Sequence, residues 1–222
     1  MDRRTFLTLP PLAAPLLFAP RARGAEPSLP MQKQRLECFG KRWLVHEASE
    51  WRAGKGPDGE VLELKTARPQ EANPRAPVQY ALLDEEPAGC FTLDLEVKGG
   101  AAVSSLIIVY AWRDPTHFNY VHLSTDAARK QPVHNGVFHV YGGDRVRISN
   151  EEGPASFADA LKWTPVRIVY NASTGLVETW IGGQKHPALR AADFSLGAGR
   201  IGLGSFFNTA SFRRFALRRG AC

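Results

Sequence analysis

Apolar residues recur at every second position along most of this chain. In residues 93–98, leucine or valine alternates with aspartate, glutamate or lysine. This spacing predicts a half-buried strand with one apolar and one wet face. Residues 106–112 form a continuous β-branched and aromatic run, which is typical of a central strand. Helical spacing is almost absent, and only residues 155–161 are expected to form a helical turn.

Short apolar segments of the same kind are separated by turn residues such as Gly142-Gly143-Asp144 and Gly182-Gly183. They predict further strands at 43–46, 60–64, 79–82, 118–124, 137–141, 145–148, 166–170, 177–181, 200–204 and 211–217. An α/β fold would need crossover helices between its strands, so it is excluded. We therefore expect a single all-β domain, built as a sandwich or a barrel.

The first 24 residues predict an export signal. Arg3-Arg4 is followed after one residue by Phe6-Leu7, the mark of a bacterial twin-arginine signal, and small residues precede a cleavage point near Ala25. The apolar run is too short and too rich in proline to span a membrane. We expect a signal at 1–24, a linker at 25–38, a sandwich domain at 39–219, and a periplasmic or secreted protein without stable membrane insertion after cleavage.

The formal charge of +6 suggests nucleic acid at first sight. Four arginines belong to the predicted signal and four more lie near the C-terminus, so the body of the domain is nearly neutral. A phosphate-binding groove needs clustered lysine and arginine, and we expect no nucleic-acid partner.

Three cysteines, Cys38, Cys90 and Cys222, are too widely spaced for a zinc knuckle or a redox pair. In an oxidising compartment Cys38 and Cys90 would form a bridge. The alternative is that both are small buried apolar residues.

Three segments carry a family resemblance: YAWRDPTHFNYVHL at 110–123, HNGVF at 134–138 and GRIGLGSF at 199–206. They resemble the concanavalin A-like, laminin G-like jelly rolls, and most of all exported bacterial members akin to the 3-keto-disaccharide hydrolase domain. The resemblance covers roughly residues 42–217. It implies a two-sheet antiparallel jelly-roll sandwich whose concave face meets glycans.

Many members of this family hold calcium near the last strands with acidic residues. This chain has Arg213 and Arg214 in that region, and calcium needs several oxygen ligands. We therefore expect no metal and no other cofactor.

A candidate ligand site follows from the alternating polar positions. If the predicted strands are neighbours, one face carries aromatic rings, imidazoles and guanidinium groups, the types that contact sugars. We expect ligand contacts from Tyr120, His122, His139, Tyr141, Arg145 and Arg147, with His134 and Asn135 from the preceding loop. The alternative is an outward polar face without a ligand, with His134 and Asn135 bracing the hairpin that follows.

The candidates for catalysis are weaker. Asp94 and Glu96 share a strand face nearly 7 Å apart, given a rise of about 3.3 Å per residue, within the range of an inverting glycosidase. His117, Tyr120 and His122 supply the acid and base types of a polysaccharide lyase. Asp114, before a proline, is expected to organise a turn instead.

The sequence thus favours an exported protein that binds an extracytoplasmic poly- or oligosaccharide. A carbohydrate-active enzyme is the first alternative: a glycoside hydrolase, a 3-keto-glycoside hydrolase or a polysaccharide lyase. A non-catalytic structural or protein-binding module is the second.

Overall fold

The computed structural model of the 222-residue chain describes residues 33–69, 75–127, 130 and 134–220. The predicted export signal, the first part of the predicted linker and Cys222 lie outside the described residues.

Strands make up almost all of the regular structure of the described chain, and a single turn of 3-10 helix, Ala48–Glu50, lies between β2 and β3. The strands of the first half are β1 (Gln34–Cys38), β2 (Lys41–Val45), β3 (Trp51–Gly56), β4 (Gly59–Leu64), β5 (Gln79–Leu83), β6 (Cys90–Gly99), β7 (Ser105–Asp114) and β8 (His117–Ser124). Those of the second half are β9 (Gly136–Tyr141), β10 (Asp144–Arg147), β11 (Thr164–Asn171), β12 (Leu176–Ile181), β13 (Gln184–Ala192), β14 (Arg200–Ser205) and β15 (Ala210–Gly220).

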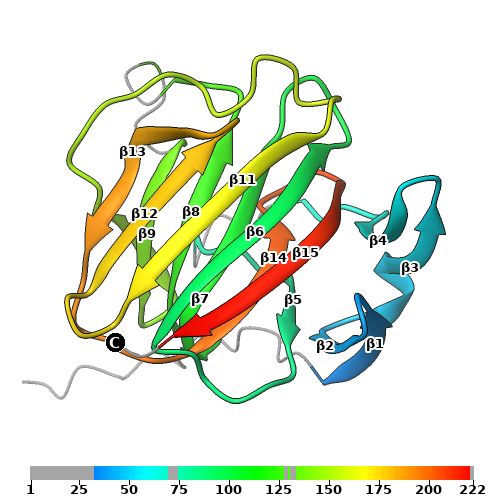
Figure 1. Cartoon of the computed structure of the whole chain (residues 1–222), viewed down its shortest axis with the longest axis horizontal. Helices are drawn as coiled ribbons and strands as arrows, with labels where there is room; N and C mark the ends of the chain where they lie inside the picture. The colour runs from blue at the N-terminus through cyan, green and yellow to red at the C-terminus, as the bar shows by residue number, and fades with distance from the viewer. Residues whose placement is uncertain (1–32, 70–74, 128–129, 131–133, 221–222) are drawn as a thin grey trace, which may run out of the picture.

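The strands form two antiparallel sheets packed as a jelly-roll sandwich, which confirms the predicted fold class. Sheet A has the order β1-β2-β5-β14-β7-β8-β9-β10, and sheet B has the order β13-β12-β11-β6-β15-β4-β3. Figure 1 looks onto sheet B, with β11, β6 and β15 side by side in the front layer and β7, β8 and β14 behind them.

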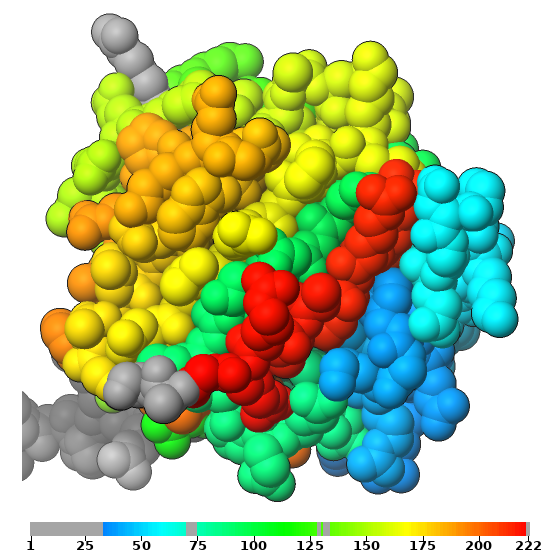
Figure 2. All heavy atoms as spheres, in the orientation of Figure 1, coloured from blue at the N-terminus to red at the C-terminus, as the bar shows by residue number. Residues whose placement is uncertain are grey.

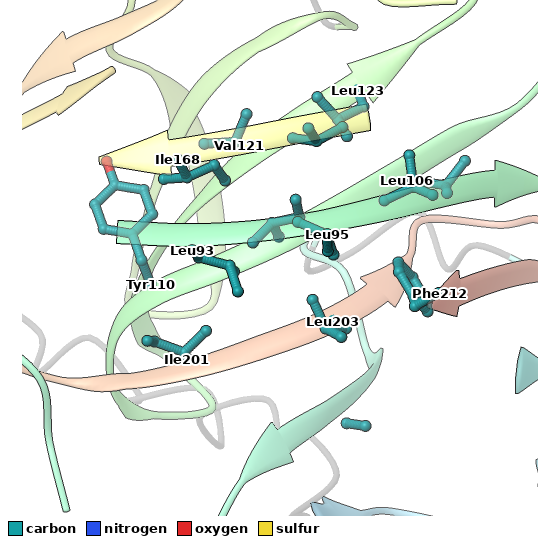
Figure 3. Packing of buried hydrophobic residues seen from close by; sticks show 14 of the residues in the cluster. Leu93, Leu95, Leu106, Tyr110, Val121, Leu123, Ile168, Ile201, Leu203 and Phe212 are labelled. Carbon is teal, nitrogen blue, oxygen red and sulfur yellow. The ribbon is translucent and has the colours of Figure 1, made fainter. Parts of the chain in front are cut away.

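The main core lies between the two sheets and follows from the period-two pattern. Leu93 and Leu95 of β6 face Leu106 of β7, Val121 of β8 and Leu203 of β14 (Figure 3). All five side chains are at most 3% exposed. Burying an aliphatic side chain of this size stabilises the fold by about 1.5–3 kcal/mol, so this layer holds the sheets together.

Three strands were not predicted, and all three are sheet edges. β1 ends sheet A, while β3 and β13 end sheet B. β3 is exposed over most of its length, and β13 contains Pro187, which an edge strand tolerates. β1 and β3 each bury a single residue, and the four buried residues of β13 do not alternate strictly, so none of the three shows a period of two. The helical turn expected at 155–161 does not form either, since that segment contains only bends and one turn.

The predicted linker at 25–38 is too long at its C-terminal end. Its last five residues form β1, paired with β2 in register from Gln34–Val45 to Cys38–Lys41. Leu36 packs against the core and Cys38 is buried in it. Pairing of β1 with β2 therefore buries apolar side chains.

Cys38 is a free thiol, and burial raises its pKa to about 11. Cys90 is disulfide-bonded. A Cys38–Cys90 bridge is therefore absent. The alternative, that both are small buried apolar residues, is confirmed for Cys38 and wrong for Cys90, which is bonded to another cysteine.

Candidate functional site

The outer face of sheet A carries a second apolar cluster, separate from the core between the sheets. Its members come from β5, β7, β8 and β9 and from the segments beside β5 and β14: Ala76, Tyr80, Leu82, Ile107, Val109, Trp112, Phe118, Tyr120, Phe138, Val140 and Phe206, with Leu44 and Phe207 packed against them. We call this set the aromatic face. A sandwich with two sheets needs only its inner faces to be apolar, so an aromatic outer face points to a further role.

Glycines in β14 allow β5 to approach closely on the side of the aromatic face. Gly202 and Gly204 lie opposite Val109 and Ile107 of β7, while Leu203 between them faces the core. A Cβ on Gly204 would lie 2.3 Å from the carbonyl oxygen of Gln79 and 2.7 Å from the Cβ of Tyr80. Any larger residue there would push β5 away, because real Cβ atoms do not approach so closely.

The rings of β8 and β9 stack directly across the ladder. Tyr120 pairs with Phe138, and the two rings lie 5.3 Å apart at an interplanar angle of 13°. His122, two residues further along β8, stacks on Phe206 with centroids 5.3 Å apart. Tyr120 and His122 therefore lie on one face of their strand, as predicted.

Arg145 of β10 lies across these rings. Its guanidinium carbon is 4.9 Å from the centroid of Phe138 and 4.3 Å from that of Phe206, within the range of cation–π contacts. Its Nη1 donates a hydrogen bond of 3.0 Å to the Tyr120 hydroxyl. Burial raises the pKa of Tyr120, with Arg145 acting in the opposite direction, so the hydroxyl stays protonated at neutral pH.

A histidine–aspartate pair adjoins the rings. His134 meets His122 edge to face at 5.6 Å, and its Nδ1 lies 3.2 Å from Oδ2 of Asp126. Burial opposes ionisation of Asp126, but hydrogen bonds from His134 and Lys130 hold the pKa of this carboxyl below its ordinary value. The carboxylate can only accept, so His134 carries its proton on Nδ1 and, when neutral, offers a lone pair on Nε2.

Exposure divides these residues into two groups. Tyr120 and His122 are fully buried and Phe138 is 2% exposed. Arg145, His134, Asp126 and Phe207 are half-buried and lie at the margin. A ligand approaching the aromatic face would meet the marginal groups, while the buried rings position them.

His139 and Tyr141 do not belong to this face, and their predicted place beside Tyr120 is wrong. His139 lies opposite Asn119, one residue out of phase with Tyr120. Its Nδ1 is 2.8 Å from the Asn119 side-chain oxygen and 3.1 Å from Asp193 Oδ2. Tyr141 is 70% exposed and contacts the rings of His117 and His139. Val137, Phe138 and Val140 make both faces of β9 apolar. The alternation of polar and apolar residues therefore did not show on which face His139 and Tyr141 lie.

Asn135 and Arg147 brace the chain after β10. Asn135 has a positive φ of 47°, is fully buried, donates to the Pro154 carbonyl and accepts from the Ser156 hydroxyl. Arg147, opposite Phe138 and on the same face as Arg145, donates to Ser149 Oγ at 3.0 Å and to the Glu151 carbonyl at 2.9 Å. Asn135 thus makes bracing contacts, the alternative stated for it, and Arg147 makes bracing contacts that were not predicted.

Asp114 organises a turn, as predicted. Its Oδ1 accepts from the Thr116 backbone N–H at 2.8 Å and from the Thr116 hydroxyl at 2.7 Å. The carboxylate also lies 3.0 Å from His117 Nδ1. His117 is held at the start of β8 by this turn, well separated along the strand from His122.

Asp94 and Glu96 lie on the outer face of sheet B, on one side of β6 as predicted. Each is bound by arginines: Asp94 by Arg167 and Arg218, Glu96 by Arg213 and Arg214. Burial opposes ionisation of Asp94, but the two guanidinium hydrogen bonds lower its pKa. A glycosidase acid must be protonated to act, so this arrangement argues against catalysis by the pair.

Among the residues that the structure describes, no three or more histidine, cysteine, aspartate or glutamate side chains lie where they could hold a metal ion. The same part of the chain has no helix long and apolar enough to cross a bilayer.

Sequence reasoning missed Phe138, Phe206 and Asp126. Phe206-Phe207, directly after a strand that alternates glycine with isoleucine and leucine, is a signal that was present in the sequence. Phe138 became identifiable only through its pairing with Tyr120. Asp126 follows β8 by two residues, and its contact with His134 depends on the path of the intervening chain.

Comparisons with known proteins agree with this architecture. No family model matches the sequence, and no curated protein matches it either. Among solved structures, the chain is similar to a carbohydrate-binding module, CBM66, from Bacillus subtilis, with a TM-score of 0.58, 12% identity and coverage of 82% of this chain and 99% of that one.

Two further structures belong to enzymes of Bacillus licheniformis. The GH43 protein BlXynB matches with a TM-score of 0.54 and 12% identity over 80% of this chain and 37% of that one. The β-glucanase matches with a TM-score of 0.50 and 9% identity over 79% of this chain and 84% of that one. At such identities these similarities show the jelly-roll fold alone.

Proposed function

We propose that this chain is an exported carbohydrate-binding protein that holds a glycan at the margin of its aromatic face. The observation that carries the proposal is the environment of Arg145. Its guanidinium is stacked on two aromatic rings and fixed by the Tyr120 hydroxyl, so its remaining N–H groups are pre-oriented donors. Sugar recognition needs such fixed polar groups beside apolar ring surfaces.

The neighbouring groups complete a set suited to hydroxyl-rich ligands. Asp126 supplies a carboxylate acceptor, His134 an imidazole and Phe207 an apolar ring edge, all half-buried. The similarity to CBM66, which is described as a carbohydrate-binding module, supports the same ligand class. Export through the twin-arginine route is part of the proposal and rests on the sequence of residues 1–24.

The proposal is tested by glycan-array screening followed by calorimetry with the best neutral and acidic oligosaccharides. Arg145→Met keeps an unbranched apolar side chain over the rings but removes the donors, and we expect binding to weaken at least tenfold, about 1.4 kcal/mol. Arg190→Met is the matched control. It removes a guanidinium from β13, where Arg190 pairs with Glu178, and should leave affinity unchanged. Equal affinity of Arg145→Met and the unaltered protein would refute the site.

A second function, a carbohydrate-active enzyme, is favoured by one observation. The Asp126–His134 hydrogen bond fixes the tautomer that leaves Nε2 as a base, the arrangement that general-base catalysis requires. This candidate includes the 3-keto-glycoside hydrolase, glycoside hydrolase and lyase reactions. Incubation with glycans retained on the array, followed by assays for reducing ends and for unsaturated uronates, decides between binding and turnover. Turnover that His134→Ala abolishes would establish the enzyme.

A further inference from the structure

A cavity of about 330 Å³ opens on the outer face of sheet B, on the opposite side of the sandwich from the aromatic face. Trp180, Arg167, Asp94, Glu96, Arg214 and Gly183 line it. In Figure 2 the green atoms of β6 lie between the yellow atoms of β11 and the red atoms of β15, and all three strands contribute residues to this cavity. We propose that the cavity is a second glycan-binding site, and that it takes one uncharged sugar unit.

The strand register aligns the side chains of the cavity. Trp180 of β12 lies opposite Arg167 of β11, which in turn lies opposite Asp94 of β6. The next residue in this row, on β15, is the small Ala216. The row thus consists of a tryptophan, an arginine–aspartate ion pair and a small alanine. The difference in side-chain size leaves a hollow beside the tryptophan ring.

An irregularity in β15 builds the wall on the far side of the hollow. The ladder between β15 and β6 shifts register between Arg213 and Ala216, and Arg214 takes a positive φ of 54°. Both Arg213 and Arg214 therefore reach Glu96, at 2.7 Å and 2.6 Å. A non-glycine residue in this conformation is uncommon and marks a position that the surrounding structure holds in place.

The mouth of the cavity is open at the turn between β12 and β13. Gly183 has no side chain, and a Cβ built on it would meet no atom within 4 Å. The Trp180 side chain is half-buried, and Lys185 lies over its ring with Nζ 5.3 Å from the centroid. Lys185 is itself paired with Glu178.

The charges around the cavity favour an uncharged ligand. Asp94 and Glu96 are bound by four arginines, and one of these, Arg213, is also bound to Asp58. A charged ligand would have to displace a carboxylate or a guanidinium from its partner. Sugar hydroxyls donate to carboxylates and accept from guanidinium groups at once, so they can add to the pairs without breaking them. Trp180 offers the apolar surface against which the C–H face of a sugar packs.

The volume limits the size of the bound unit. About 330 Å³ is at the lower end of the roughly 300–1,000 Å³ of ligand pockets, which suits one sugar ring with part of its neighbour. Two sites on opposite faces would let one molecule hold two glycan chains, or two segments of one chain, with the gain in avidity that two linked sites give.

The experiment is calorimetric titration of the full chain with cellotetraose, xylotetraose and laminaritetraose, with tetragalacturonate as the charged comparison. The variants are Trp180→Ala and Trp180→Phe. The matched control is Trp163→Ala, which removes another half-buried tryptophan, one whose ring lies under Lys98 and Arg213. Thermal melts of all variants verify that they fold.

We expect at least one neutral tetrasaccharide to bind, at least tenfold weaker binding at this site for Trp180→Ala, and near-normal binding for Trp180→Phe and Trp163→Ala. The inference shares only the ligand class with the proposed function. If Arg145→Met weakened binding and Trp180→Ala did not, the second site would be overturned and the site at the aromatic face would stand. If Trp180→Ala weakened binding and Arg145→Met did not, the second site would stand and the site at the aromatic face would be overturned. Preference for tetragalacturonate, or no binding by any of the four sugars, would also overturn it.

Discussion

The two outer faces of the sandwich are built on opposite principles. The aromatic face of sheet A is closely packed, and Tyr120, Phe138 and Phe206 are at most 4% exposed. The outer face of sheet B carries a network of arginine–carboxylate pairs, in which the side chains of Arg167 and Arg218 are 54% and 60% exposed. One face is held by ring contacts that exclude water, and the other by charges that remain in contact with it.

Stability and recognition therefore depend on the same residues on sheet A, but on different residues on sheet B. On sheet A, the residues that would position a ligand also contribute to the folded state, because their rings are buried. On sheet B, exposed ion pairs contribute little stability, with a typical value of about 0–1 kcal/mol. Substitutions there should change recognition with little effect on folding.

The largest expected effect is that of truncating a ring of the aromatic face. Phe138→Ala should lower the free energy of unfolding by about 3–5 kcal/mol, as for a buried phenylalanine of an inner core. Urea unfolding followed by circular dichroism measures it. Phe194→Ala, at a ring that is 69% exposed, is the control and should change stability by less than about 0.5 kcal/mol. If both variants lost the same small amount, the aromatic face would have no role in stability.

A smaller effect is expected from the hydrogen bond between Arg145 and Tyr120. Tyr120→Phe keeps the ring stacked and removes only the acceptor, which should cost about 1–2 kcal/mol because the donor is charged and the hydroxyl is buried. The double-mutant cycle of Tyr120→Phe with Arg145→Met isolates the pair, and a coupling energy of similar size should appear. Additive effects of the two changes would show that the pair does not interact.

The smallest effect is expected on sheet B. Asp94→Asn should cost less than about 1 kcal/mol at pH 7 and in low salt, and less in high salt. The folded protein lowers the pKa of Asp94, so the stabilisation is present above the unfolded pKa of about 3.9 and is lost as the pH falls through the lower, folded pKa. Unfolding curves of both proteins from pH 7 to pH 3 should converge on the acid side. A gap that widened on acidification would contradict the assignment.

The fold was largely predictable because two-sheet burial imposes a period of two on the central strands. Leu93, Leu95 and Val97 must turn inward for sheet B to pack on sheet A, and the alternation with charged residues shows this directly. β1 and β3 were missed because each buries a single residue and so shows no pattern. β13 was missed because its four buried residues do not alternate strictly.

The candidate site was predictable only in part. β8 alternates clearly enough to assign Tyr120 and His122 to one face. β9 is apolar at successive positions, so the assignment of His139 and Tyr141 to that face needed the ladder register and was wrong without it. Asn135 and Arg147 could be separated from the ligand-binding candidates only by their contacts with Pro154, Ser149 and Glu151.

The amino-acid sequence was sufficient to predict the fold class, the central strands, the turn at Asp114 and one face of β8, because each depends on local spacing or on the chemistry of neighbouring residues. The pairing of strands that are distant along the chain came from the tertiary structure. That pairing placed Phe138 and Arg145 beside Tyr120 and assembled the cavity at Trp180. It also brought Asp94 and Glu96 into ion pairs with arginines more than 70 residues away along the chain. Contacts between distant segments depend on register and strand order, and a period of two specifies neither.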